Sequence, residues 1–529
     1  MRRLALFWLF TLFPVLTIPA LAQSEVGQVS FANSGSPGAQ EPFLRGLALL
    51  HNFEYPDAAE QFRKAQAADP DFAMAYWGEA MTCTHPVWFQ QDLKAARAVL
   101  ERLGATPEAR LAKAKTERER DYLRTLDVLY GEGSKNERDF RYSDAMALLH
   151  QRYPDDVDAT AFYALSLLGT AHEGRDFGIY MKSAALLEEV FPTHQQHPGV
   201  LHYLIHSYDD PVHAPLGVRA ARLYGKVAPN AGHALHMTSH IFVALGRWDD
   251  VIAANERAMA VVNQHRAEAS KPPKTCGHYV TWLHYGYLQE RRLDDAKGQL
   301  DACRRMAQNE ASGGPGADGD LTVPSAYTEM RLFHWIETGR WEAADAITLP
   351  ADRFADAKFL AAYGGALAAS AGGDRSALHA AAARLHERHK DLLAEIARKK
   401  ENVTLERPYA DLVVRQIDAL ATLRDGKKEE GIAELSQVAE AESAMPMEFG
   451  PPAIQKPSPE LLGDELLALG RNAEAEKAYQ AALLRAPGRT RSLQGLLRVQ
   501  QALGHTEAAE RTRAQLREYL REEKAAEIR

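Results

Sequence analysis

The sequence predicts an all-α fold built from about 12 repeated helix pairs. Apolar residues recur at helical spacing through most of the chain, and runs of β-branched residues are short, so signals for strands are almost absent. A helix, a short turn and a second helix return at a spacing of roughly 34 to 45 residues. Such an array grows by stacking units, so a chain of 529 residues does not need several separate cores.

The clearest unit covers residues 43–70, FLRGLALLHNFEYPDAAEQFRKAQAADP. Tyr55-Pro56 form the turn between its two helices, and Pro70 stops the second helix. The same frame returns at 461–487, LLGDELLALGRNAEAEKAYQAALLRAP, and at 240–258, HIFVALGRWDDVIAANERA. Weaker helix pairs lie between these three, which indicates one continuous array.

This frame resembles the tetratricopeptide repeat superfamily over nearly the whole mature chain. The resemblance implies a right-handed superhelical solenoid in which the first helix of each pair lines a concave groove, where ligands are commonly held. The blocks HPGVLHYLIHSYDDP at 197–211 and HALHMTSHIF at 233–242, followed by CGHY at 276–279, also look like a group of secreted bacterial tetratricopeptide proteins. No activity is carried over with that likeness.

The first residues have the pattern of an export signal. Arg2 and Arg3 precede the apolar stretch Leu4–Leu21, and Ala20-Leu21-Ala22 has the form of a cleavage site. We expect cleavage near Ala22 and a periplasmic or secreted mature protein. No other apolar run is long enough to span a bilayer, so no membrane span is expected in the mature chain.

Two stretches rich in Gly, Pro and Ser, Ser312–Asp320 and Met445–Pro459, are expected to be connections between blocks of repeats. The resulting division of the chain is a signal peptide at 1–22, an N-terminal tail at 23–40, an N-terminal repeat array at 41–311, a middle helical block at 321–444 and a C-terminal repeat pair at 459–529.

Charge and cysteine content exclude several classes of protein. The net charge is −9 with both signs interspersed, so the basic stripe that nucleic acid requires is missing and no nucleic-acid partner is expected. Cys83, Cys276 and Cys303 do not form a disulfide framework. A Cys276–Cys303 bridge is compatible with the repeat, but we expect buried free thiols. No nucleophile elbow or phosphate-binding loop is present, and the sequence leans away from an enzyme.

Histidines carry the strongest functional signal. The pairs His202/His206 and His236/His240 have the form HxxxH and stand 34 residues apart. Because 34 residues is also a repeat length, the two pairs are expected on neighbouring first helices. Positions two before and two after a packing position, here Leu204, point about 160° away from it, so these histidines face away from the partner helix.

By resemblance, this outward face lines the groove. His233 lies one turn before His236, and the next first helix carries His278, Thr281 and Tyr285 at the equivalent places, while His284 falls on a packing position. Neutral imidazole is the commonest transition-metal ligand, and histidines at i and i+4 can chelate one ion. The candidate ligands for Cu or Zn are therefore His202, His206, His233, His236, His240 and His278.

Carboxylates near the array are weaker candidates. Asp209 and Asp210 end the first histidine helix and could complete a metal site. Glu460 and Asp464 occupy the frame positions of His202 and His206, and a curling array could turn them towards the histidines. Glu79 stands where the repeat usually places a small residue. Each has the alternative of an ordinary solvated or hydrogen-bonded position. Six other histidines are expected to be scattered or on the solvent side, namely His51, His85, His150, His334, His386 and His389.

Three functions fit these patterns. An exported scaffold would hold a peptide or a protein partner in its groove. A metal-binding protein or metalloenzyme would use the paired HxxxH motifs to hold Cu or Zn. A subunit of an envelope or export assembly is a third reading. Many unrelated functions are carried by one fold, so the repeat alone does not decide among them.

Overall fold

The computed structural model describes residues 25–309, 322–342, 345–350, 353–398 and 406–520. The expected signal peptide at 1–22 and the expected connection Ser312–Asp320 lie outside the described residues.

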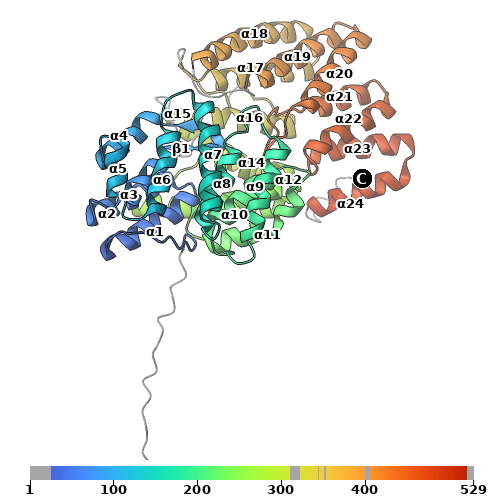
Figure 1. Cartoon of the computed structure of the whole chain (residues 1–529). Helices are drawn as coiled ribbons and strands as arrows, with labels where there is room; N and C mark the ends of the chain where they lie inside the picture. The colour runs from blue at the N-terminus through green and yellow to red at the C-terminus, as the bar shows by residue number, and fades with distance from the viewer. Residues whose placement is uncertain (1–24, 310–321, 343–344, 351–352, 399–405, 521–529) are drawn as a thin grey trace, which may run out of the picture.

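The described chain is an all-α array, as the repeat pattern predicts (Figure 1). The helices of its first half are α1 (Pro37–His51), α2 (Tyr55–Ala68), α3 (Ala73–Met81), α4 (Leu93–Leu103), α5 (Pro107–Lys113), α6 (Glu117–Leu129), α7 (Lys135–Arg152), α8 (Val157–Leu168), α9 (Phe177–Val190), α10 (Pro198–Tyr208), α11 (Ala214–Val227) and α12 (Gly232–Ala244). A two-stranded sheet of β1 (Thr84–His85) and β2 (Gln90–Gln91), with the 3-10 turn η1 (Pro86–Trp88) between them, interrupts this half.

Twelve further helices complete the array. They are α13 (Trp248–Glu268), α14 (His278–Gln289), α15 (Leu293–Asn309), α16 (Val323–Thr338), α17 (Ala355–Ala371), α18 (Arg375–Arg398), α19 (Glu406–Arg424), α20 (Lys428–Ala444), α21 (Ser458–Ala468), α22 (Asn472–Arg485), α23 (Thr490–Leu503) and α24 (Thr506–Tyr519). Neighbouring helices pack as successive hairpins, with α5 as an extra short helix. The described residues between Gly339 and Phe354 contain no α-helix, so α16 has no helical partner there.

Small residues at fixed places let the helices of a unit approach closely. The ring of Phe62 on α2 is fully buried and lies against Gly46 of α1 and Gly78 of α3, where a β-carbon would crowd or overlap the ring. Gly246 and Gly470 end first helices with φ of +67° and +72°, a conformation that glycine adopts without strain.

The array curls until distant units touch. Near its start, the turn between α1 and α2 packs on α10 and α11, where the Tyr224 hydroxyl donates to Asn52 Oδ1 at 2.7 Å. Near its end, the turn before α23 packs on α12 to α14, with Trp248 Nε1 donating to the Gly488 carbonyl at 2.9 Å and Gln289 Oε1 accepting from the Thr490 amide at 2.9 Å. The helices around α12 are therefore held from both ends of the chain (Figure 1).

Two segments expected to lie outside the packed array are part of it. Residues 25–36 of the expected tail have an irregular backbone, but Val26 and Phe31 are buried in the main core and α1 already begins at Pro37. The expected connection Met445–Pro459 also packs, because Phe449 and Ile454 find apolar partners there. We call the segment 445–457 the strap.

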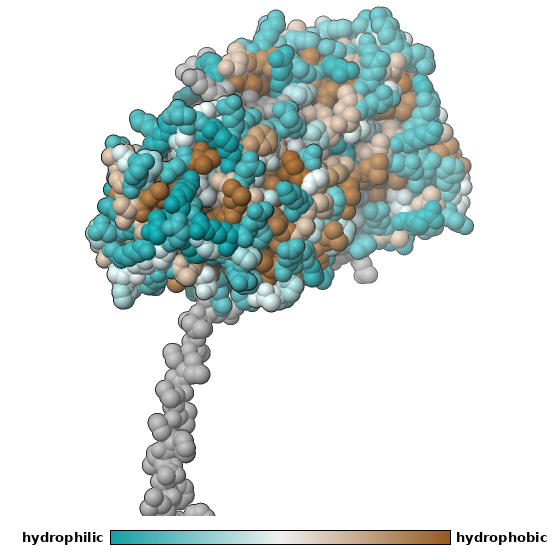
Figure 2. Space-filling view, viewed as in Figure 1, coloured by the Kyte–Doolittle hydropathy of each residue, from teal (hydrophilic) through white to brown (hydrophobic). Residues whose placement is uncertain are grey.

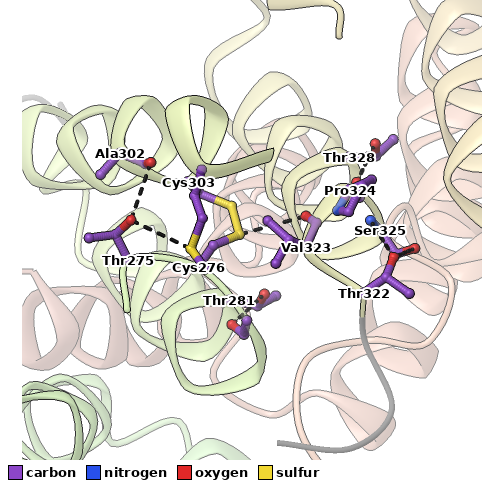
Figure 3. The surroundings of a disulfide bond; sticks show 12 residues. Thr275, Cys276, Thr281, Ala302, Cys303, Thr322, Val323, Pro324, Ser325 and Thr328 are labelled. Carbon is purple, nitrogen blue, oxygen red and sulfur yellow. Dashed lines mark hydrogen bonds between the residues drawn. A yellow bond between two sulfur atoms is a disulfide. The ribbon is translucent and has the colours of Figure 1, made fainter. Parts of the chain in front are cut away.

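The cysteine expectation was wrong. Cys276 and Cys303 form a disulfide that joins the residues before α14 to α15 (Figure 3). The repeat explains the pairing, since the first residues of one helix of a hairpin lie beside the later turns of the other. Cys83, by contrast, is a free thiol and half-buried.

The face drawn in Figure 2 is mostly hydrophilic, with several separate apolar patches near its middle. Among the described helices, none is both long and apolar enough to cross a membrane.

Candidate metal centre

Six histidines from three consecutive first helices form one buried group, which we call the histidine cluster. The cluster consists of His202 and His206 on α10, His233, His236 and His240 on α12, and His278 at the start of α14. Five are buried and His278 is half-buried. Neighbouring rings have centroids 4.7 to 6.1 Å apart, so each ring touches at least one other.

Local sequence explains the placement. Residues four apart lie on the same face of a helix, so each HxxxH pair projects two imidazoles together. α10 begins at Pro198, where the His197 side chain accepts from the Val200 amide and caps the helix. α10 and α12 are adjacent, and their facing histidines, His206 and His240, have ring centroids 5.5 Å apart. The repeat spacing therefore predicts the convergence of the two pairs.

The first set of three histidines is His202, His206 and His233, whose metal-binding atoms all lie within 4.8 Å of one another. In each ring Nδ1 has a partner. His202 Nδ1 donates to the His51 carbonyl at 2.7 Å, His206 Nδ1 lies 3.3 Å from Asp209 Oδ2, and His233 Nδ1 lies 3.2 Å from the Tyr279 hydroxyl. Each Nε2 is buried without a hydrogen-bond partner among the described residues.

The second set of three is His236, His240 and His278, again within 4.8 Å. His236 Nδ1 lies 2.7 Å from Asn255 Oδ1, and His240 Nδ1 lies 2.9 Å from Asp209 Oδ2. The two Nε2 atoms of His236 and His240 face each other at 3.3 Å.

Asp209 joins the two sets. Its Oδ2 lies beside both His206 Nδ1 and His240 Nδ1, and its other oxygen pairs with the buried Arg175. Burial would raise the pKa of Asp209, but the charge of Arg175 and the hydrogen bonds from the two histidines hold that pKa below its ordinary value. The carboxylate is therefore an ionised acceptor that orients one histidine of each set.

Burial holds five of the six imidazoles neutral. Burial lowers the pKa of His240 to about 4 and that of His278 to about 3. Burial, together with neighbouring histidines, also lowers the pKa values of His202, His233 and His236 well below the ordinary value of 6.5. Neutral imidazole is the form that binds a metal, so these five histidines are in their ligand form near pH 7.

Aromatic side chains close the site from several sides. The Phe53 ring lies 4.2 Å from that of His202, the Trp282 ring stacks on His240 at 4.4 Å, and Phe449 from the strap stacks on His240 at 5.0 Å. Phe53 has φ +58°, a left-handed conformation that costs roughly 1–2 kcal/mol in a residue with a side chain. The predicted face is therefore covered by other parts of the chain and is not an open groove at this place.

The other groove candidates lie apart from the cluster. Thr281 donates to the Gly277 carbonyl of its own helix, and the Tyr285 hydroxyl accepts from Arg489. Glu460 and Asp464 do come from the repeats that curl back, but they form a buried ionic network instead of facing imidazoles. Their partners in that network are Lys456, Arg489, Arg491, Ser492 and Tyr479.

Glu79 is buried, and its partners are Arg63, Gln66 and Arg102. The carboxylate therefore stabilises the packing of α2, α3 and α4. His284 packs away from the cluster, 3.4 Å from His334 Nδ1, as its packing position predicts.

His51, expected to be scattered or on the solvent side, is instead buried beside the histidine cluster. His51 is fully buried, and its Nε2 lies 2.9 Å from Asp158 Oδ1, which His197 Nε2 also contacts at 3.2 Å. The carbonyl of His51 is the partner of His202 Nδ1. No sequence signal places His51 here, because it ends α1, 151 residues before His202, and reaches α10 only when the array curls.

No protein-family model matches the chain, and no curated protein matches it. Among solved structures, the chain is similar to the Cut9–Hcn1 hetero-tetramer of the APC/C at 11% identity and a TM-score of 0.35, covering 89% of this chain and 78% of that one. The P58(IPK) TPR domain is 13% identical with a TM-score of 0.22, and the match covers 89% of this chain and 99% of that one. A monomeric IFIT1 mutant with Gppp-AAAA is 11% identical with a TM-score of 0.33, and the match covers 88% of this chain and 94% of that one.

Likenesses this distant carry no argument about function. The class of the protein rests on its own architecture, which is an all-α helical-repeat solenoid closed around a buried cluster of six histidines.

Proposed function

We propose that the chain binds a transition-metal ion, Cu or Zn, through the Nε2 atoms of His202, His206 and His233. One observation carries the proposal: the three histidines bring ring nitrogens within 4.8 Å of one another, and their buried Nε2 atoms have no hydrogen-bond partner among the described residues. A buried acceptor left without a partner costs about 1–3 kcal/mol, so three at one point are expensive unless something binds them. Imidazole nitrogens suit Cu and Zn.

The surroundings of the three rings support the same reading. Histidine ligands commonly donate their other ring N–H to a carbonyl, a carboxylate or another acceptor, which fixes the tautomer and aims the free nitrogen at the metal. His202 has a carbonyl, His206 a carboxylate and His233 a hydroxyl in that place. The carbonyl and the carboxylate can only accept, so they place the proton of His202 and His206 on Nδ1, and the Tyr279 hydroxyl is able to accept from His233 Nδ1 in the same tautomer.

The set supplies three protein ligands, which leaves a fourth position of a tetrahedral ion for water or a small molecule. Structural zinc sites use four protein ligands, whereas sites that react or exchange a ligand keep one position open. The proposed role is therefore a centre that stores and delivers the ion or carries out a reaction at the open position.

Metal content tests this function. The mature chain, purified without a histidine tag, is expected to contain stoichiometric Cu or Zn by mass spectrometry, and a His202→Ala variant is expected to lose the ion held by the first set. His284→Ala is the matched control, because His284 is equally buried but outside the cluster. Absence of bound metal, together with an unchanged melting temperature on adding Cu or Zn, would contradict the proposal.

The proposal includes export of the chain by the segment 1–22. The Cys276–Cys303 disulfide supports it, since disulfides persist in oxidising compartments and are rare in the cytosol. The mature protein from a cell fraction is expected to begin near Gln23, and recovery of a chain that retains Met1 would contradict export.

A second function, peptide binding, has one observation in its favour. A cleft of ≈ 530 Å³ lies against the first helices α16, α17, α19 and α21 of the C-terminal half. Its lining includes the indoles of Trp335 and Trp341 beside Asp464, Arg424 and Arg491, a mixture that suits an extended peptide with charged and apolar side chains.

Peptides selected from a random library on the mature protein test this second function. They are expected to lose at least tenfold in affinity with a Trp341→Ala variant. Unchanged binding to this variant would place the peptide elsewhere.

A further inference from the structure

We infer that the second set, His236, His240 and His278, holds a metal ion of its own, so that the histidine cluster is a two-ion centre. The inference rests on the proposed function, because it assigns a second ion beside the first. Two triads that share no histidine make up the cluster, and each brings three ring nitrogens within 4.8 Å of one another.

Hydrogen bonds fix the tautomers of the second set. Asn255 Nδ2 donates to the Val251 carbonyl at 2.9 Å, so Asn255 Oδ1 faces His236 as an acceptor and His236 carries its proton on Nδ1. Asp209 Oδ2 is an acceptor, so His240 also carries its proton on Nδ1. Both Nε2 atoms therefore present lone pairs.

Those two lone pairs face each other at 3.3 Å. Two acceptors cannot form a hydrogen bond with each other, so the arrangement calls for a cation between them. Two nitrogens bound to one tetrahedral ion at about 2.0 Å are separated by about 3.3 Å. The observed separation is thus the one that a shared ion requires.

His278 supplies the third nitrogen, and its position is fixed. It is the first residue of α14, directly after Gly277, which has φ +118°. The Cys276–Cys303 disulfide ties this point of the chain to α15 (Figure 3). A histidine at a loose helix end would be a poor ligand, whereas this one is held by a covalent link two residues away.

Charge favours Cu⁺ for the pair. All six proposed ligands are imidazoles, which bind a metal as neutral groups, and the carboxylate that contacts His206 Nδ1 and His240 Nδ1, Asp209, is already paired with Arg175. Placing ionic charge in a buried site without compensation is costly, so two Cu⁺ ions disturb the site less than two divalent ions.

Anaerobic titration of the metal-free mature chain with Cu⁺, in competition with a chelator of known affinity, tests the inference. Two ions per chain are expected for the wild type and one for His278→Gln, whose half-buried position limits the effect on folding. His233→Gln is expected to retain one ion in the second set, and the control His284→Gln two.

The number of Cu⁺ ions bound per wild-type chain tests the two-ion centre without the use of any variant. One Cu⁺ per chain would overturn the two-ion centre and leave the proposed function standing, whereas no bound Cu⁺ or Zn²⁺ would overturn both. Two ions retained by His278→Gln would overturn the assignment of the second ion to this set.

Discussion

The partner of each Nδ1 decides what the opposite nitrogen of a histidine can do. In the first set, a carbonyl, a carboxylate and a hydroxyl lie beside the Nδ1 atoms of His202, His206 and His233, and every Nε2 is buried without a hydrogen-bond partner among the described residues. If the same histidines were scattered over a surface, each would form hydrogen bonds to water at both ring nitrogens. Burial and these partners orient the three histidines as the proposed metal centre requires.

Tyr279→Phe tests this at one atom. It removes the hydroxyl beside His233 Nδ1 and leaves the ring that stacks on His236. Loss of such a partner typically weakens metal binding 10–100-fold, so we expect a loss of about tenfold in the affinity of the first set, measured by chelator competition. Tyr287→Phe is the control, because its hydroxyl on the same helix contacts Glu256 instead. Equal affinities of wild type and Tyr279→Phe would contradict the role given to Tyr279.

The six histidines could be predicted from the sequence, but most of their partners could not. The offset of 34 residues places the HxxxH pairs on adjacent first helices, and it depends only on two neighbouring repeats. The His51 carbonyl and the Phe449 ring reach the cluster from turns far away in the chain. Their approach depends on the curvature summed over many units, which no repeat motif encodes.

Among the elements, the strap decides whether the cluster is open. Its Pro-rich sequence is typical of a flexible connection, and yet Phe449 stacks on His240. Next to it, Gly450 has φ +89° and lies so close to the Trp282 indole that a β-carbon would overlap the ring. Composition alone does not show such a packed role, because proline and glycine suit both a loose linker and a fixed irregular segment.

Gly450→Ala should therefore loosen the strap. The added β-carbon has to push away either the strap or the indole, and we expect the chelator-induced release of metal to become about tenfold faster, the change that 1.4 kcal/mol produces. Gly470→Ala is a matched control, since Gly470 also has a positive φ but its β-carbon would meet nothing. If both variants release metal at the same rate, the strap does not cover the site.

For the whole molecule, the closed solenoid makes stability depend on pH. Burial lowers the pKa of His51 and His240 to about 4 and that of His278 to about 3, from 6.5 when unfolded. As the pH falls below about 6.5, these histidines become protonated in the unfolded chain but stay neutral in the folded chain. These three histidines therefore lower the free energy of unfolding progressively as the pH falls from about 6.5 to about 4.

Buried carboxyls oppose this trend. Burial raises the pKa of Glu54, Glu329 and Glu448 to about 7, so these groups favour the folded state as the pH falls from about 7 to 4.5. More histidines than carboxyls are affected. Besides His51, His240 and His278, burial also lowers the pKa of four other histidines well below 6.5, namely His202, His233, His236 and His284. Urea unfolding of the metal-free chain is expected to show a lower free energy of unfolding at pH 4.5 than at pH 7. An equal or higher value at pH 4.5 would contradict neutral burial of the histidines.

The repeat pattern predicts the helix order well, and the all-α solenoid is confirmed. What it does not predict is closure. A local frame places His202 on an outward face and implies an open groove there, but the turn after α1 and the strap return to the same helices and place Phe53 and Phe449 against the histidines. The change from an open groove to a buried cluster moves the favoured function from peptide binding at the histidines to metal binding.

Anomalous scattering from crystals of the metal-loaded chain, recorded at the absorption edge of the bound metal, tests the central claim most directly. We expect an anomalous-difference peak about 2.0–2.1 Å from the Nε2 atoms of His202, His206 and His233. A metal-loaded crystal whose peaks lie beside other residues, with these three nitrogens free of metal, would contradict it.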